Sequence, residues 1–503
     1  MLEAFIHGLF NQFHPTFFGV LFLGVVIGIF LGVVPAISGF AGMALLLPIV
    51  YGWDKGVAFA FLLAIQGVSC AGGAITAILL GIPGDSPNAA TVIDGYALTK
   101  IGDGGRAIGA ALTGSSLAGV LAVFFAFLLI PGITPVVLSL HMPEMFFIML
   151  LGLSFVAVLG SGSHIKGFIS GGLGISASFI GYQATSGIPR FTFGSSYLID
   201  GLGIIPVTLG LFAGVELMEL AVYQRTIARD GDFAPPRMQM LQGVKDFFKH
   251  IPLWLRSTVV GYIVGVIPGI GCNIASFVSY GQAKHSAKEP DKFGKGAVEG
   301  VIAPESANAA VSGGALLTTL SFGIPGSATM AVLLAAYLMV GITPGVRLLT
   351  ENPELSFTML WAVAISNMLG GVLCFLIAPY LIRVTKIHPH YIMACVSPII
   401  FISAYSVNGS MVDIIVVLIF TGIGIWMNNL GYSRPAFILG FILGKLFEQY
   451  FWFSIKLEGQ FFFLRPISLA LITVLILLLC LNPIKSAVRS LLLREHQANE
   501  KRP

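Results

Sequence analysis

The stretch "ILLGIPGDSP", residues 78–87, interrupts an apolar segment with Gly-Ile-Pro-Gly and continues at once with Asp-Ser-Pro. The stretch "TTLSFGIPGS", residues 318–327, interrupts a second apolar segment in the same way. Proline removes a backbone donor and clashes with the preceding helical turn, while glycine permits the bend that follows. The sequence therefore predicts two helices that are broken at equivalent points, at Pro83 and Pro325.

Apolar segments long enough to cross a membrane recur on both sides of these breaks. Of the 503 residues, 56% are hydrophobic and only 10% are charged, whereas a soluble protein has roughly 25% charged residues. We count about eleven to thirteen segments that meet the ~20-residue length of a membrane-spanning helix. The predicted fold class is an all-α polytopic membrane protein of transmembrane or re-entrant helices in a lipid bilayer. The net charge of +4 does not indicate nucleic-acid binding.

The chain also resembles itself, because four pairs of segments match in the same order. The pairs are "GVVPAISG" (32–39) with "GVIPGIGC" (265–272), "AGGAITAILLGIPG" (71–84) with "SGGALLTTLSFGIPG" (312–326), 117–135 with 369–389, and 205–219 with 434–449. The first pair contains two further predicted helix breaks, at Pro35 and Pro268. One glycine-rich match is weak, but four in order indicate an internal duplication with repeats at 16–222 and 255–452.

Charged segments mark the limits of the two repeats. A segment at 1–15 precedes the first repeat, a polar loop at 223–254 connects the two, and a final transmembrane region at 453–484 leads to a basic tail at 485–503. The loop and the tail have the highest density of Lys and Arg, and the positive-inside rule places such segments in the cytoplasm. We therefore expect a cytoplasmic C-terminus.

The orientation of the repeats follows from the charges beside the breaks. The segment 257–282 is broken at Pro268 and has basic residues on both flanks, which a re-entrant hairpin from the cytoplasm accommodates and a full crossing does not. Irregular backbone at membrane depth is tolerated where it is buried in protein or lines a cavity. The equivalent segment 18–50 has no net basic flank, so we expect entry from the opposite side. This predicts two inverted repeats, the usual build of secondary transporters.

Polar residues gather after the breaks, where the next half-helix presents bare amides and about half a positive charge. Two such helix starts can hold an anion, and the unwound carbonyls beside them can hold a cation. The candidate substrate-binding residues are Ser38, Gly84, Ser86, Asn88, Asn273, Asn308, Gly326, Ser327 and Thr329. The candidate ligands of a coupling ion, sodium or a proton, are the carboxylates Asp85, Asp94 and Glu305.

Each candidate also has a structural interpretation. A Ser or Thr hydroxyl often bonds to its own helix or joins two helices, worth about 1 kcal/mol. Asp85 can lie in a surface loop, Asp94 can cap a helix or be solvated, and Glu305 can sit at a helix start. A carboxylate at mid-membrane costs about 2.5–3.5 kcal/mol, so it would be functional. The five cysteines lack the spacing of a metal site, and we expect no metal centre and no cofactor beyond the coupling ion.

Several long stretches resemble a known family. The most specific is "FGKGAVEGVIAPESANAAVSGGALLTTLSFGIPGSATMAVLLAAYLMVGITPG" (293–345), and three others are "GVIPGIG" (265–271), "DGYALTKIGDGGRAIGAAL" (94–112) and 434–468. Together they are similar to the TctA family, the large membrane subunit of the tripartite tricarboxylate transporters. The resemblance covers nearly the whole chain.

The resemblance implies a multi-pass protein of the bacterial inner membrane. Such a subunit would work with a small four-helix membrane subunit, TctB-like, and a periplasmic solute-binding protein, TctC-like. It would import a small di- or tricarboxylate or related organic acid by symport with sodium or protons. The sequence has no Walker-type phosphate loop, in agreement with secondary active transport.

Two other functions stay open at this point. A passive organic-anion channel is less favoured, because paired discontinuous helices are typical of coupled carriers. A membrane-embedded enzyme would need a convergent cluster of His, Asp or Cys, and the sequence shows none. We therefore expect the protein not to be an enzyme.

Overall fold

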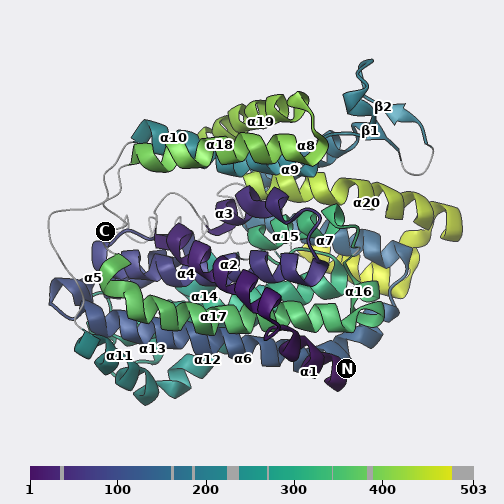
Figure 1. Ribbon diagram of the computed structural model, residues 1–503. Helices are drawn as coiled ribbons and strands as arrows, with labels where there is room; N and C mark the ends of the chain where they lie inside the picture. The colour runs from purple at the N-terminus through teal and green to yellow at the C-terminus, as the bar shows by residue number, and fades with distance from the viewer. Residues whose placement is uncertain are drawn as a thin grey trace, which may run out of the picture. The chain divides into compact units, whose positions relative to one another are not determined.

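The structure is a computed structural model of the chain. It describes residues 1–33, 39–159, 164–183, 187–223, 237–268, 271–342, 344–381 and 389–477. These residues are almost entirely helical (Figure 1). The one sheet that they form pairs β1 (Gly181–Tyr182) with β2 (Pro189–Arg190), antiparallel. The predicted all-α class is confirmed.

Six of the described helices are long and apolar enough to cross a membrane. They are α2 (Pro15–Val33), α4 (Lys55–Leu80), α6 (Gly104–Leu138), α17 (Pro353–Leu381), α19 (Met411–Asn429) and α20 (Arg434–Glu458). Shorter apolar helices lie at 39–50, 142–154, 251–266, 329–339 and 466–477. The two groups together agree with the lower end of the expected range, and the chain is a multi-pass membrane protein.

The two Gly-Ile-Pro-Gly breaks have the same backbone conformation. Helix α4 ends at Gly81 with φ 70° and ψ 19°, and α14 (Glu299–Phe322) ends at Gly323 with φ 68° and ψ 20°. Glycine adopts this left-handed conformation without the strain that a side chain brings. A new helix starts after each break, η2 (Ser86–Asn88) with α5 (Ala89–Lys100) after the first and α15 (Ala328–Met339) after the second. The breaks predicted at Pro83 and Pro325 are confirmed.

The predicted hairpin around Pro268 is formed by two short helices. Helices α12 (Ile251–Val266) and α13 (Gly271–Ser286) pack against each other and against α14. In the first repeat α2 is followed by α3 (Gly39–Leu46). The predicted break at Pro35 and the predicted substrate-binding residue Ser38 lie outside the described residues. The side of the membrane from which each hairpin enters stays a prediction, and so does the inversion of the repeats.

The same close helix contacts recur in both halves of the chain. A Cβ atom added at Gly72 of α4 would lie 2.7 Å from the carbonyl oxygen of Ile29 in α2, and one at Gly314 of α14 would lie 2.4 Å from that of Tyr262 in α12. Only glycine allows backbones to approach so closely. Two further contacts match in the same way. Gly28 contacts the backbone of Ile65 as Gly261 contacts that of Ala307, and Gly32 contacts the backbone of Ser69 as Gly265 contacts that of Val311. Helices α2 and α4 therefore pack in the same register as α12 and α14.

Both of these helix pairs are preceded by a short helix. Helix α1 (Leu2–Asn11) packs on α17, where the indole of Trp361 donates to the carbonyl of Phe5 at 2.9 Å. Helix α11 (Arg237–Lys249) packs on α6. The connecting segment 223–254, which reads as a polar loop, thus contains a helix that the sequence did not predict.

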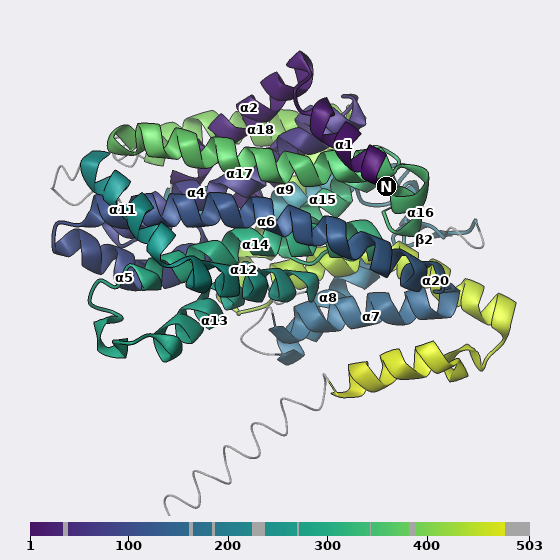
Figure 2. The ribbon, with the colours of Figure 1, turned by 90° about the horizontal axis from the view of Figure 1, so that it is seen from below.

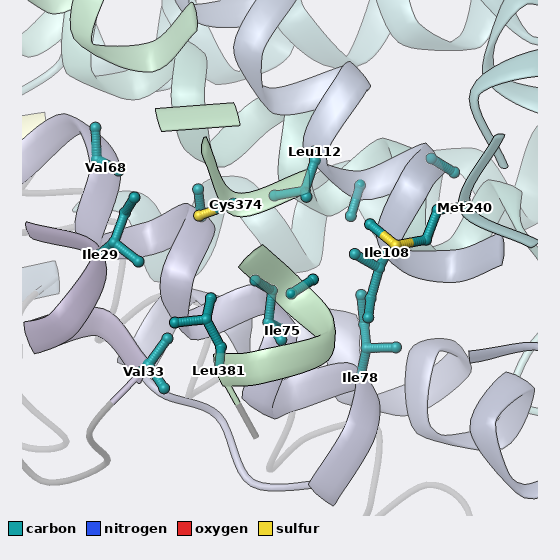
Figure 3. Close-up of a cluster of buried hydrophobic side chains, with 14 of the residues drawn as sticks. Ile29, Val33, Val68, Ile75, Ile78, Ile108, Leu112, Met240, Cys374 and Leu381 are labelled. Atoms are coloured by element: carbon teal, nitrogen blue, oxygen red, sulfur yellow. The ribbon is translucent and has the colours of Figure 1, made fainter. Parts of the chain in front are cut away.

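The apolar core joins helices from both halves of the chain. Figure 3 shows its buried side chains, which come from α2, α4, α6, α11 and α17: Ile29, Val33, Val68, Ile75, Ile78, Ile108, Leu112, Met240, Cys374 and Leu381. Around it the long helices α4, α6, α14 and α17 run side by side (Figures 1 and 2). This core holds the two broken helices α4 and α14 in place.

The chain divides into two compact units, Met1–Leu138 with Gly201–Leu430, and Ser139–Asp200 with Gly431–Pro503. In the second unit α20 packs on α7 (Met142–Leu159) and α8 (His164–Ser178). In the first, α9 (Ile204–Leu209), η4 (Gly210–Gly214) and α10 (Val215–Tyr223) pack with α18 (Pro389–Asn408) and α19. Shorter elements of the first unit are η1 (Leu47–Val50), η5 (Pro290–Lys292) and α16 (Val346–Glu351), and those of the second are η3 (Tyr197–Ile199) and η7 (Phe462–Leu464). Each unit takes segments from both predicted repeats, whose boundaries stay predictions.

Candidate functional site

A buried carboxylate of α14 meets the residues that follow the first break. Glu305 is 1% exposed. Its Oε1 accepts hydrogen bonds from Asn88 Nδ2 at 2.9 Å and from Thr91 Oγ1 at 2.5 Å. Asn88 ends η2 and Thr91 lies in the first turn of α5. The break in the first half of the chain therefore delivers two donors to a helix of the second half.

Asn88 ties this carboxylate to the broken helix itself. Its Nδ2 also donates to the carbonyl of Cys70 in α4 at 3.1 Å, and its Oδ1 accepts from the backbone of Asp85 at 3.3 Å. Asp85 caps η2 by accepting from the backbone of Ser86 at 2.8 Å. One amide side chain thus holds the helix before the break, the loop and Glu305 in a fixed geometry.

Asp85 is the second carboxylate of this cluster and is half-buried. It accepts a hydrogen bond from the backbone of Gly39, at the start of α3. The thiols of Cys70 and of Cys272, at the start of α13, lie near enough to interact electrostatically with it. Residues at the starts of α3, η2 and α13 therefore lie around one carboxylate. That such helix starts hold an anion stays a prediction.

Two buried carboxamides lie beside this cluster. Asn308, one helical turn after Glu305, is 2% exposed, and its amide lies against the Cys70 thiol, a weak hydrogen-bond partner. Among the described residues, neither its Oδ1 nor its Nδ2 has a nitrogen or oxygen partner. Gln66 of α4 is 6% exposed. Its Nε2 donates to Ser312 Oγ at 2.9 Å, while its Oε1 has no partner. A buried amide without partners costs free energy, so these groups require an explanation.

Gln66 is the site residue that the sequence analysis missed. It lies in the middle of an apolar helix, away from any proline. The signal that could have found it is the internal repeat, because Gln66 lies six residues before Gly72 and Asn308 lies six residues before Gly314.

Asp94 has a different environment from Glu305. Its Oδ1 accepts from the backbone of Gly294, Gly296 and Ala297 at 2.8–2.9 Å, and its Oδ2 accepts from Tyr280 Oη at 2.9 Å. These bonds anchor the loop that leads into α14. Asp94 itself is buried in the interior of α5, so it is neither at a helix end nor solvated. A role for Asp94 in ion binding stays a prediction.

The remaining predicted residues lie apart from Glu305. Ser327 caps α15 by accepting from the backbone of Met330 at 3.3 Å. Gly326 is buried against Ala315, where an added Cβ would lie 2.6 Å from its Cα. Gly84 is buried and Thr329 half-buried at the breaks, while Ser86 and Asn273 are exposed. No hydrogen bond in the described parts of the chain joins these side chains to Glu305, and their binding roles stay predictions.

The second break lacks the polar cluster of the first. In the aligned repeats, the positions of Glu305, Asn88 and Thr91 correspond to Leu63, Met330 and Leu333, and these three side chains are at most 1% exposed. The buried carboxylate is therefore present in one repeat only, whereas each repeat has one buried carboxamide, Gln66 in the first and Asn308 in the second.

The described part of the cluster has no basic side chain. Among the residues whose side chains the structure describes, no Lys or Arg is buried, and none interacts electrostatically with Glu305. An anion bound here would meet amides, hydroxyls and helix starts. A cation bound here would meet carboxylates.

Charged residues outside the spans hold the start of α14. Glu299 Oε1 lies 3.1 Å from His250 Nε2, and this contact raises the pKa of His250. In α11, burial alone would raise the pKa of Asp246, but hydrogen bonds from Lys249 and Arg106 outweigh it and lower that pKa. The α11 segment is thus fixed both to α6 and to the helix that carries Glu305.

Comparison with known proteins assigns the family. Residues 18–439 match the family described as "Tripartite tricarboxylate transporter TctA family". A relative from Agrobacterium vitis, described as "Uncharacterized 52.8 kDa protein in TAR-I ttuC' 3'region", is 31% identical over 458 residues, 90% of each chain. A second protein of that organism, "Uncharacterized protein in TAR-II ttuC' 3'region", is 32% identical over 190 residues, 38% of this chain and 78% of the relative. No solved structure matches. The chain therefore belongs to the TctA family of tripartite tricarboxylate transporter subunits.

Proposed function

We propose that this chain is the large permease subunit of a secondary transporter that imports a small di- or tricarboxylate, or a related organic acid, across the bacterial inner membrane. The observation that carries the proposal is Glu305, a buried carboxylate held by Asn88 and Thr91 across a helix break. The family supports a tricarboxylate substrate.

The position of Glu305 supports coupling to a cation. An ionised carboxylate is costly in a buried site that contains no positive charge. Sodium or a proton would neutralise it, and an anionic substrate would then enter without repulsion from Glu305. Because ionised Glu305 and a bound anion repel each other, substrate binding favours ion binding and ion binding favours substrate binding. This reciprocal effect is the thermodynamic basis of symport.

The broken helices support a carrier rather than a channel. They place irregular backbone where it is buried in protein, as in transporters built from repeats. Movement of one set of short helices against the long helices α6 and α17 would expose the cluster alternately to the two sides. A passive channel would need a continuous open path instead.

Two partners follow from the tripartite description of the family. We propose a small four-helix membrane subunit and a periplasmic solute-binding protein that delivers the substrate. The gene neighbourhood identifies both candidates. The connecting segment 223–254 and the C-terminal tail would face the cytoplasm because of their Lys and Arg residues.

An uptake experiment with purified components tests this function. The chain, its small membrane subunit and its binding protein are reconstituted in proteoliposomes and given radiolabelled citrate, succinate or tartrate. We expect saturable uptake that exceeds equilibrium only when a sodium or proton gradient is imposed, with the label recovered in unchanged substrate. Equilibration without accumulation would indicate a channel, chemical conversion would indicate an enzyme, and no uptake of any probe would contradict the proposal.

A further inference from the structure

The two buried carboxamides occupy equivalent positions of the two repeats. The alignment is fixed by Gly72 and Gly314, whose neighbours on α2 and α12 correspond one to one: Ile29, Gly32 and Val33 with Tyr262, Gly265 and Val266. In this register Gln66 corresponds to Asn308, and Cys70 corresponds to Ser312. The correspondence of Gln66 with Asn308 and of Cys70 with Ser312 thus follows from how the helix backbones pack, and does not depend on the chemical similarity of these side chains.

The contacts of the pair are reciprocal. Gln66 on α4 bonds to Ser312 on α14, and Asn308 on α14 lies beside Cys70 on α4. Gln66 and Asn308 are equivalent in the alignment, and so are Ser312 and Cys70, so the two contacts are equivalent as well. Such an exchange is what an approximate two-fold relation between α4 and α14 would produce, with one amide on each side of the axis.

Unused hydrogen-bonding capacity is concentrated at this point. Three amide atoms, Asn308 Oδ1, Asn308 Nδ2 and Gln66 Oε1, are buried without a nitrogen or oxygen partner among the described residues. A polar ligand that supplied partners would recover the free energy that their burial costs. Because the axis relates the two amides, a ligand with a polar group at each end fits them best.

We propose that Gln66 and Asn308 are the substrate-binding amides of this carrier and hold the two polar ends of a small dicarboxylate-type anion between α4 and α14. The proposal rests on the proposed transport function and specifies its substrate site. Neutral amides bind carboxylate oxygens through their N–H groups, here Asn308 Nδ2 and the N–H of Gln66 Nε2 that Ser312 does not use, while Asn308 Oδ1 and Gln66 Oε1 would accept from a hydroxyl group of the substrate. A cation at Glu305, one turn away from Asn308, removes the negative charge that would repel the anion. The symmetric amides thus determine substrate recognition, and the single carboxylate determines coupling.

Uptake by Asn308→Ala tests this assignment. In proteoliposomes with both partners, we measure the half-saturating concentration of whichever of succinate, citrate or tartrate wild type transports. We expect it to rise about ten- to hundred-fold on loss of one or two hydrogen bonds to a charged ligand, while the dependence of uptake on the coupling ion keeps its shape. The melting temperature should change little, since the Cys70 thiol is the one weak partner of the Asn308 amide among the described residues. Gln66→Ala should also raise the half-saturating substrate concentration.

Ser306→Ala is the matched control on the same helix. Its hydroxyl bonds to Ile302 of α14 at 2.6 Å and faces Gly114 of α6, away from the amide pair. We expect wild-type half-saturation for this variant. An unchanged half-saturating concentration in both amide variants would overturn the assignment. A fall in melting temperature large enough to explain the reduced uptake by unfolding would overturn it too. Failure of wild type to take up any probe would instead contradict the proposed function.

Labelling of Cys70 gives a second readout that does not depend on transport. In a variant that keeps Cys70 and replaces the other four cysteines with alanine, the transported probe should slow the reaction of Cys70 with N-ethylmaleimide, because Cys70 lies beside Asn308. Asn308→Ala should abolish this protection. Protection that persists in that variant, or that is absent although the parent variant transports the probe, would place the substrate elsewhere.

Discussion

Glu305 is the residue on which the proposed mechanism depends, and its neighbours decide how it can act. Both donors to its Oε1 come from the segment after the first break, so any movement of that segment changes the surroundings of the carboxylate. Asp94 lies one turn beyond Thr91, yet its carboxylate is satisfied by three backbone amides and a tyrosine hydroxyl. Burial is the same for both carboxylates, and the bonding partners distinguish them.

Asn88→Ala should impair transport more than stability. The change removes the donor to Glu305 and the bond to the Cys70 carbonyl, a loss of about 1–3 kcal/mol in unfolding free energy. Because it also frees the loop after the break, we expect initial uptake to fall at least about ten-fold. Asn429→Ala, which removes an exposed carboxamide at the end of α19, is the control and should transport normally. Equal uptake by the two variants would contradict the role of Asn88.

Asp94→Asn should show the opposite balance. Loss of the charge weakens the bonds that anchor the loop before α14, and we expect the unfolding free energy to fall by about 1–3 kcal/mol. The ion dependence of the remaining uptake should match wild type. Asp103→Asn, an exposed carboxylate in a weak ion pair, should leave both quantities unchanged. A shifted ion curve at normal stability would instead assign Asp94 to the ion site.

At the scale of helices, the features that could be predicted from the sequence are those that depend on neighbouring residues in the chain. The breaks were predictable, because the proline of Gly-Ile-Pro-Gly has no backbone N–H to donate and clashes with the preceding helical turn. Helix α11 was not, because its charged residues read as a loop and its buried face exists only through packing on α6. Gln66 was missed for a related reason: its neighbours are apolar, and its pairing across α14 is a tertiary contact. Asn88 was predicted from the break, whereas its contact with Glu305 required the structure.

Gly326→Ala should disturb the second break although alanine favours helix. The added Cβ would lie 2.6 Å from the Cα of Ala315 and 2.9 Å from the carbonyl oxygen of Gly265, both backbone atoms that cannot yield easily. We expect overpacking to cost about 1–3 kcal/mol and transport to fall. Gly132→Ala in α6, where nothing lies within 4 Å, should be neutral or stabilising. The test compares the melting temperatures of the two purified variants. Equal values would contradict the predicted overpacking at Gly326.

The contact between His250 and Glu299 should make the anchor of α14 depend on pH. The folded-state pKa of His250 is raised, chiefly by its hydrogen bond to Glu299. The stabilisation is therefore complete below the ordinary histidine pKa of about 6.5 and is lost as the pH rises through the folded-state value. We expect the difference in melting temperature between wild type and His250→Gln to be larger at about pH 5.5 than at about pH 9. A constant difference would show that the contact is not ionic.

At the scale of the whole molecule, the repeats are interleaved rather than separate. Helices α7 and α8 from the first half pack on α20 from the second, and α18 and α19 from the second half pack with α9 and α10 from the first. The same exchange brings α5 onto α14 and thereby creates the Glu305 cluster. A duplication can be predicted from sequence, but which copies pack together depends on the fold. The divergence of one half-site, polar at the first break and apolar at the second, makes the assembled site asymmetric.

Substrate accumulation by Glu305→Gln tests the central claim most directly. The variant keeps a hydrogen-bonding side chain of similar size but removes the charge that a coupling ion would neutralise. In proteoliposomes with both partners and an imposed sodium or proton gradient, wild type should concentrate the transported probe above equilibrium. We predict that Glu305→Gln lets the probe equilibrate but never accumulates it, whichever gradient is applied. Accumulation to the wild-type level by this variant would contradict the claim that Glu305 couples transport to an ion.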